Sequence, residues 1–230
     1  MENPRSILIV SSLMIVTLLF ISVIVFDDKP YLMISMAIMV LTTIPLFARF
    51  ELKQIQSKEI VFLAVLAAIA AISRVPFAPL PSVQPTSFVI IVSAIVLGPQ
   101  AGFIIGASAA IVSNIFLGQG PWTPWQMFAW GMIGLVAGLL RNTAIMKNKY
   151  GLIGYGFIVG ILFGWFMNLW FIMGFLGELT WPVFLSAYVA SFYFDLAHGL
   201  SNVFFLFLFS VAWIRILQRF KEKYGILREY

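Results

Sequence analysis

The sequence predicts an all-α membrane protein, a polytopic bundle of about eight transmembrane helices with both termini in the cytoplasm. Of its 230 residues, 62% are hydrophobic and only 10% are charged, whereas soluble domains carry about 25% charged residues. The apolar runs reach about 20 residues, the length that a helix needs to cross the hydrocarbon core of a bilayer. Short alternating strands separated by turns, the pattern of a membrane barrel, do not occur. We therefore expect a multi-pass protein of the cell membrane.

Eight hydrophobic segments follow one another along the chain. The first is too long for the apolar region of a signal peptide, so we expect a retained helix. The fourth segment is short, with a possible start at Pro81–Gln84. The last is longer than one crossing requires, which suggests an interfacial turn near Trp181 and a cytoplasmic extension. The approximate bounds are 7–26, 30–48, 58–74, 85–98, 101–117, 124–141, 151–174 and 183–218.

The charges in the loops give the expected orientation. Basic residues follow the second and sixth segments and close the chain, whereas the loops after the third and fifth segments carry no charge. With the N-terminus inside, every Lys and Arg except Lys29 and Arg74 lies on the cytoplasmic side, as the positive-inside rule requires. The net charge of +5 therefore reflects membrane topology rather than nucleic-acid binding.

Because the chain has no cysteine, disulfides and thiolate chemistry are excluded.

The distribution of polar residues divides the chain into unequal parts. Residues 1–50 are rich in Ile, Leu, Val and Met and form a predicted appended pair of transmembrane helices. Residues 51–57 are a polar cytoplasmic linker. Residues 58–220 carry nearly all of the glycine, tryptophan and amide side chains, so we expect a six-helix substrate-binding module there. Residues 221–230 form a basic cytoplasmic tail.

A polar stripe runs along the last segment at membrane depth. Its central members are spaced 4, 3 and 4 residues apart and share one helical face. Polar and ionisable groups are costly in a bilayer, so the stripe lines a ligand cavity or meets other helices. A ligand-facing wall, a packed Asp–His pair that fixes helix register and a proton relay are the open interpretations. The stripe consists of Tyr188, Ser191, Asp195, His198 and Asn202.

Aromatic and amide side chains gather at the expected outer surface. The proline-rich, uncharged loop 76–85 is expected to be extended. An aromatic belt at the membrane interface accounts for the tryptophans but not for the amides. Aromatic faces with interspersed amides suit a flat, polar, largely uncharged organic molecule. Arg74 is either a ligand contact or a snorkelling arginine. The candidate substrate-binding residues here are Arg74, Gln84, Trp122, Trp125, Gln126 and Asn168.

Small residues four apart form possible helix contacts. Ala64/Ala68 and Ala67/Ala71 are such pairs, and they allow another helix to approach closely. Either internal packing or contact with a partner subunit would explain these pairs.

The motifs of ATPases and of membrane hydrolases do not occur. Walker, GxSxG and HExxH motifs are absent from the sequence, so we expect neither ATP hydrolysis nor intramembrane hydrolysis by this chain. With a single histidine, we expect no metal site.

Four features occur together between about residues 57 and 220: the lysine-flanked helix that begins at Lys58 with its alanine strip, the loop 76–85, the turn Gly98–Gln100 and the run Trp125–Gly138. In these features the chain resembles the substrate-binding S components of energy-coupling factor (ECF) vitamin transporters. The resemblance implies a six-helix protein that captures a vitamin from outside. It also implies a transmembrane coupling subunit (T component) and two cytoplasmic ATPases as partners, with ATP used by those partners.

The resemblance also implies roles for particular residues. The alanine strip of such proteins contacts the coupling subunit, which makes Ala64, Ala68 and Ala71 the interface candidates. The sequence looks closest to members associated with cobalamin or related corrinoids, while riboflavin, thiamine, queuosine precursors and pyridoxine-type substrates stay open. We expect no covalently bound cofactor. A membrane enzyme that uses Asp195 and His198 as a catalytic pair and a scaffold without a ligand are the alternative functions.

Overall fold

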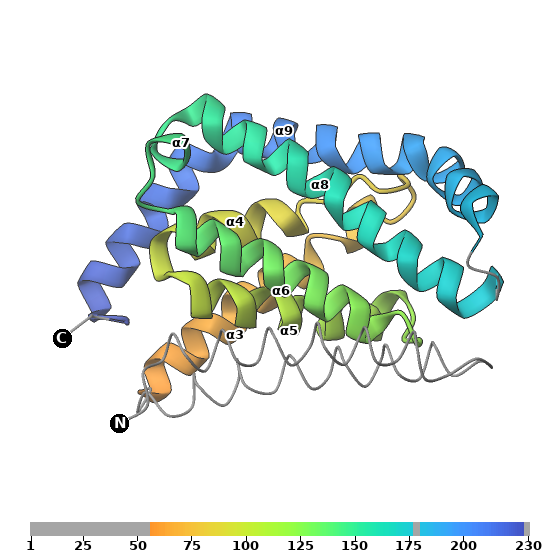
Figure 1. The fold of residues 1–230 in the computed structure, drawn as a ribbon. Coiled ribbons are helices and arrows are strands. Elements are labelled where there is room, and N and C mark those ends of the chain that lie inside the picture. The colour runs from red at the N-terminus through yellow and green to blue at the C-terminus, as the bar shows by residue number, and fades with distance from the viewer. Residues whose placement is uncertain (1–55, 177–179, 228–230) are drawn as a thin grey trace, which may run out of the picture.

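The computed structural model describes residues 56–176 and 180–227, and this part of the chain is helical, without a β-strand (Figure 1). The short elements within it are the 3₁₀-helix η1 (Val75–Phe77), α7 (Ala144–Lys147) and the π-helix η2 (Ile172–Leu176). The long helices are α3 (Ser57–Ile72), α4 (Thr86–Leu97), α5 (Pro99–Leu117), α6 (Thr123–Leu140), α8 (Lys149–Phe171) and α9 (Trp181–Tyr224).

The long helices agree with the six segments that the sequence predicts between residues 58 and 220. Four described stretches are long and apolar enough to cross a membrane, namely 57–77, 99–117, 149–174 and 181–224. The two predicted segments before residue 50 lie outside the described residues. The structure therefore supports the membrane class of the protein, and the total of eight helices stays a prediction.

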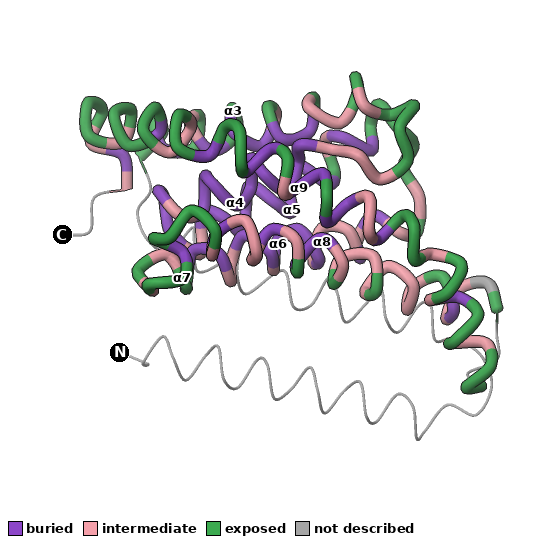
Figure 2. Tube along the Cα trace, turned by 90° about the horizontal axis from the view of Figure 1, so that it is seen from above, coloured by how far each residue is buried: buried purple, intermediate pink, exposed green. Residues whose placement is uncertain are grey.

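Helix α4 lies at the centre of the described bundle. It has only 12 residues, about 18 Å at 1.5 Å per residue, and every residue except Ile95 is buried. It packs against α3, α5, α6, α8 and α9, and Figure 2 shows the buried positions gathered around it. Because protein surrounds α4 on all sides, a helix too short to span a bilayer is stable here.

Glycines allow two pairs of helices to approach closely. Between α5 and α6, a Cβ atom at Gly102 would lie 2.6 Å from the carbonyl oxygen of Gly134. Between α8 and α9, a Cβ atom at Gly160 would lie 2.7 Å from Cα of Gly199. The small residues in these helices therefore serve internal packing.

Two connections differ from the expectation. The loop 76–85 is not extended, because η1 and successive turns compact it, with the N–H of Leu80 donating to the carbonyl of Phe77 at 2.8 Å. Pro76 lies in the first turn of η1, where its missing N–H costs no hydrogen bond. Pro182 likewise lies in the first turn of α9, where a missing N–H costs no hydrogen bond. Trp181 and Pro182 therefore begin the helix, and the interfacial turn expected near Trp181 does not form. No later proline interrupts α9, which continues to Tyr224.

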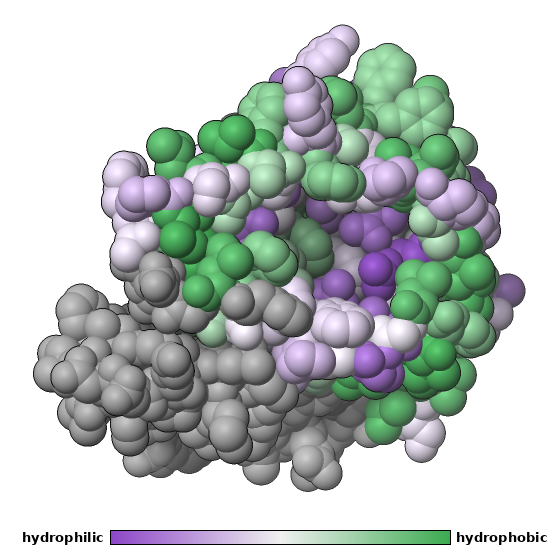
Figure 3. All heavy atoms as spheres, turned by 90° about the vertical axis from the view of Figure 1, so that its right-hand side faces the viewer, coloured by the Kyte–Doolittle hydropathy of each residue, from purple (hydrophilic) through white to green (hydrophobic). Residues whose placement is uncertain are grey.

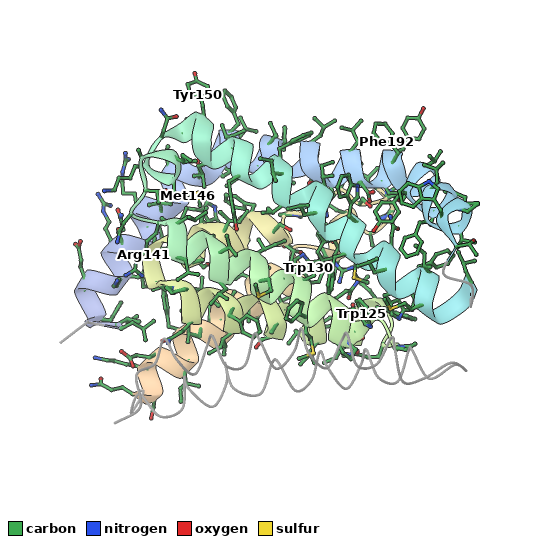
Figure 4. All side chains as sticks on the ribbon, viewed as in Figure 1. Trp125, Trp130, Arg141, Met146, Tyr150 and Phe192 are labelled. Carbon is green, nitrogen blue, oxygen red and sulfur yellow. The ribbon has the colours of Figure 1, made fainter. Side chains whose placement is uncertain are left out.

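The two ends of the bundle differ in charge. Helix α7 and the last turns of α9 lie at the left of Figure 1, and Arg141 lies there in Figure 4; we call this the basic end. Here the Arg141 guanidinium contacts Gly98, whose φ of +96° a residue with a Cβ would adopt only with strain. The Nζ of Lys221 donates to the carbonyl of Val96 at 3.0 Å. The opposite end carries the connections 73–85 and 118–122, and we call it the loop end.

Candidate functional site

The loop end carries a hollow in the molecular surface. Figure 3 views this end face on and shows hydrophilic residues gathered in the hollow, with hydrophobic residues around much of the rim. Trp125, at the start of α6, is labelled at this end in Figure 4, opposite Arg141. Polar groups inside a hollow with an apolar rim are the usual arrangement of a small-molecule site.

Arg74, just after α3, is the centre of a hydrogen-bonded group that we call the Arg74 network. Its Nε donates to Oε1 of Gln84 at 2.8 Å. One terminal nitrogen, Nη1, donates to Oγ of Ser113 at 2.7 Å and to Oδ1 of Asn114 at 3.2 Å. The side chain is half-buried. Arg74 therefore ties the loop 73–85 to the end of α5, and it does not simply extend into the bilayer surface.

The network continues from α5 into α6 through amide and hydroxyl groups. Asn114, which is 2% exposed, donates from Nδ2 to Oγ1 of Thr123 at 3.0 Å and to Oε1 of Gln126 at 2.8 Å. Thr123 in turn donates to Oε1 of Gln119 at 2.9 Å. The predicted site residues Arg74, Gln84 and Gln126 thus belong to one group, linked through a buried asparagine.

An aromatic stack supports the guanidinium. The Cζ atom of Arg74 lies 4.8 Å from the ring centroid of Trp130, a cation–π distance. Trp130 is fully buried and stacks on Phe163 of α8, with the ring centroids 4.9 Å apart. The indole N–H groups of Trp125 and Trp130 are buried without an acceptor in the described part of the chain. The stack fixes the plane of the guanidinium at the base of the network.

A second group, the Asp195 network, joins α8 and α9. Nδ2 of Asn168 donates to Oγ of Ser191 at 2.6 Å, and that hydroxyl is 2.8 Å from Oδ2 of Asp195. The hydroxyl of Tyr188 donates to the carbonyl of Trp165 at 3.1 Å. The structure therefore brings four predicted site residues together between these two helices.

The other members of the polar stripe contact different helices. Nε2 of His198 is 2.9 Å from Oγ of Ser87 on α4, and its ring lies edge-on to Phe163. Asn202 donates from Nδ2 to the carbonyl of Gly156 at 2.9 Å and is fully buried. No hydrogen bond links Asp195 to His198, both of which are described. The stripe is thus divided among several partners, and no Asp–His pair forms.

The predicted tryptophans line the start of α6. Trp122 packs edge-on against Trp170, with ring centroids 5.8 Å apart. Trp125 is 2% exposed and lies against Phe166, with ring centroids 5.1 Å apart. These contacts hold α6 against α8 at the loop end. A direct role of either tryptophan in binding stays a prediction.

A separate apolar pocket opens between α6 and α8. Its volume is about 290 Å³, and its lining includes Met132, Ile133, Tyr155 and Leu162. The hydroxyl of Tyr155, its main polar group, already donates to the carbonyl of Ile133 at 2.7 Å. This pocket offers little to a polar molecule, so the hollow at the loop end is the better candidate site.

The alanine strip of α3 lies on two faces. Ala64 is exposed and Ala68 is half-exposed, next to the exposed side chains of Val61 and Val65. Ala71 is fully buried inside the bundle. An outer partner therefore has access to Ala64 and Ala68 but not to Ala71.

Sequence reasoning did not select several residues of the site. Ser113 and Asn114 are a polar pair at the end of an apolar helix, and that position was the available signal. Ser87 and Ser201 gave no signal, because a serine in a membrane helix often bonds its own backbone. Here Ser201 instead accepts a hydrogen bond from the N–H of Gln84 at 3.0 Å and so anchors the loop 73–85 on α9.

Comparisons with known proteins agree with these features. The family model described as "ECF transporter, substrate-specific component" matches residues 58–220. A UPF0397 protein of Aliivibrio fischeri (strain MJ11) is 28% identical over 100 residues, 41% of this chain and 53% of the relative. A UPF0397 protein of Vibrio atlanticus (strain LGP32) is 30% identical over 98 residues, 40% of this chain and 52% of the relative. The chain thus spans about half the length of these curated relatives, and no solved structure matches it significantly.

Proposed function

The chain belongs to the ECF transporter substrate-specific components, and from that membership we propose that it captures a micronutrient at the loop end for ATP-driven uptake. The observation that carries this proposal is the Arg74 network, in which the connection after α3 meets α5 and α6 at the loop end. Charged and amide side chains are costly within a membrane bundle, so a guanidinium grouped with several amides indicates a function beyond internal packing.

The direction of capture rests on the charges. The basic end carries Arg141 and the lysines of α7, of the start of α8 and of the last turns of α9, namely Lys147, Lys149, Lys221 and Lys223. Positive charge favours the cytoplasmic side. The loop end then faces outward, and both termini of the module lie inside. Substrate reaches the hollow from outside the cell under this arrangement.

We propose a vitamin as the substrate, with cobalamin or a related corrinoid as the first compound to test. A corrinoid carries many amide groups, which suit a site whose side chains are mainly amides, hydroxyls and indoles. Riboflavin, thiamine, queuosine precursors and pyridoxine-type compounds are the alternatives. The match to the UPF0397 proteins covers only about half of each relative and does not favour any one of these substrates.

The partners follow from the family. We propose that a transmembrane coupling subunit docks on the exposed face of α3 at Ala64 and Ala68, where small side chains allow close approach. Two cytoplasmic ATPase subunits supply the energy. The family provides substrate-binding subunits of transporters rather than enzymes, and the lack of an Asp195–His198 bond weakens the catalytic alternative.

The decisive experiment is to purify the full chain in lipid nanodiscs and identify any small molecule that accompanies it by mass spectrometry. We expect one unmodified vitamin-class molecule per chain. Binding of the identified compound is then measured for the wild type, for Gln126→Leu in the network and for Lys147→Gln at the basic end as the matched control. A chemically converted product, or equal binding by both variants, would overturn the proposal.

A further inference from the structure

We infer that the substrate carries an anionic oxygen group, a carboxylate or a phosphate, which binds the free edge of the Arg74 guanidinium. This inference rests on the proposed function and adds the charge of the ligand to it. It also departs from the sequence expectation of a largely uncharged molecule.

The first argument is that Arg74 has no counter-charge in the described part of the chain. The carboxylates described are Glu59, Asp195 and Glu222. Glu59 bonds the backbone N–H groups of Gln56 and Leu227 near the start of α3, and Asp195 accepts from Ser191. Glu222 is exposed near the end of α9. All three acceptors of Arg74 are therefore neutral.

The second argument is the number of donors. A guanidinium has five N–H donors in a planar fork. Nε and Nη1 of Arg74 make three hydrogen bonds, while the second terminal nitrogen, Nη2, has no partner among the described residues. A carboxylate or a phosphate matches such a fork, and a charge-assisted hydrogen bond is about twice as strong as a neutral one.

The third argument is that the site is built to hold the cation in place. Asn114 and Gln84 present their oxygen atoms to Arg74, and both are anchored by further bonds to Thr123, Gln126 and Ser201. Trp130 supports the guanidinium from below at 4.8 Å. A cation that is fixed beforehand loses little side-chain entropy when an anion binds.

The fourth argument concerns the surroundings. The nearby titratable group on α9, His198, is buried and already bonded to Ser87 on α4. Trp130, which lies against the guanidinium, adds a buried indole N–H that has no acceptor among the described residues. An environment of one cation and surplus donors favours a ligand that brings oxygen acceptors and negative charge.

The test uses pairs of compounds that differ in the oxyanion. The pairs are cobalamin and cobinamide, riboflavin and flavin mononucleotide, pyridoxal and pyridoxal phosphate, thiamine and thiamine monophosphate, and biotin and biotinamide. Affinities are measured by calorimetry on the full chain in nanodiscs. The wild type is compared with Arg74→Gln, with Arg74→Lys and with the control Lys147→Gln.

We expect the wild type to bind the anionic member of at least one pair about 10- to 100-fold more tightly than its partner, as one or two charge-assisted hydrogen bonds allow. Arg74→Gln should remove this preference, Arg74→Lys should keep part of it, and Lys147→Gln should keep all of it. The phosphate and carboxylate pairs distinguish the two sources of the oxyanion.

The outcomes separate the two proposals. If a compound binds the wild type but its neutral partner binds equally well, the inference is wrong and the proposed function stands. If no member of any pair binds and no vitamin-class molecule accompanies the purified chain, the proposed function and the inference are both wrong. Should Arg74→Gln not fold, the wild-type comparison and Arg74→Lys still decide the result.

Discussion

The carboxylate of Asp195 on α9 lies directly against Gly164 of α8, so that a Cβ atom there would overlap the carboxylate oxygen. Below it, Gly160 faces Gly199, and Gly156 faces Asn202 and Leu206. One row of glycines on α8 thus receives one polar stripe of α9. Small residues let polar groups of neighbouring membrane helices meet at hydrogen-bond distance.

Adding a methyl group at Gly160 should weaken the bundle. A Cβ atom there would lie 2.7 Å from backbone atoms of Gly199, which have no side-chain freedom to move away. We expect Gly160→Ala to lower the free energy of unfolding by about 1–3 kcal/mol, as overpacking does. The matched control is Gly154→Ala on the same helix, where nothing lies within 4 Å. Equal stability of the two variants in thermal unfolding would contradict the packing.

The polar stripe should separate into a structural and a binding part. Asn202 is fully buried and bonds the carbonyl of Gly156, so Asn202→Ala should cost about 1–3 kcal/mol of stability. The substrate affinity of the folded fraction should not change. Asp195→Asn keeps an oxygen for Ser191, and so it should leave stability near that of the wild type while weakening binding through Asn168. Unchanged affinity in Asp195→Asn would assign the whole stripe to structure.

Substitutions on the exposed and buried faces of α3 should affect partner docking and folding separately. Ala64 is exposed and Ala67 is 3% exposed. Ala64→Trp should abolish assembly with the coupling subunit and uptake, while the isolated chain keeps its affinity for substrate. Ala67→Trp should instead lower stability, because a buried site cannot accept the larger side chain. Assembly is measured by co-purification, and a stable complex with Ala64→Trp would argue against docking on α3.

Glu59 should hold the end of the described chain against the start of α3. Its carboxylate accepts hydrogen bonds from the N–H of Gln56 at 3.0 Å and of Leu227 at 2.6 Å. Removing the charge weakens such bonds, so Glu59→Gln should cost about 1 kcal/mol and speed trypsin cleavage after Lys223. Glu222→Gln, at an exposed carboxylate, is the control. Equal cleavage rates would show that the contact adds no stability.

Much of the fold could be predicted from the sequence because hydropathy is a local property. The predicted segments 101–117 and 124–141 differ from α5 and α6 by no more than two residues at either end. The loop 76–85 was predicted wrongly, because proline content alone does not distinguish an extended segment from a run of turns.

The candidate site was predicted less completely. Arg74 was visible as a charge at membrane depth, but its partners Ser113 and Asn114 lie 39 and 40 residues further along the chain. Nothing in the local pattern connects residues at that separation. For the same reason, the alanine pairs looked equivalent in sequence, although Ala64 is exposed and Ala71 is buried.

By itself, the sequence determined that this protein is a helical membrane protein with a bundle between residues 58 and 220, because the length and apolarity of each segment decide whether it can lie in a bilayer. Only the tertiary structure decided which polar groups meet. The rotation of α9 about its axis sets whether Asp195 meets Gly164 on α8 and whether His198 meets Ser87 on α4. That rotation depends on the packing of all neighbouring helices. The charge proposed for the substrate therefore depends on a guanidinium whose surroundings come from four separate helices and a loop.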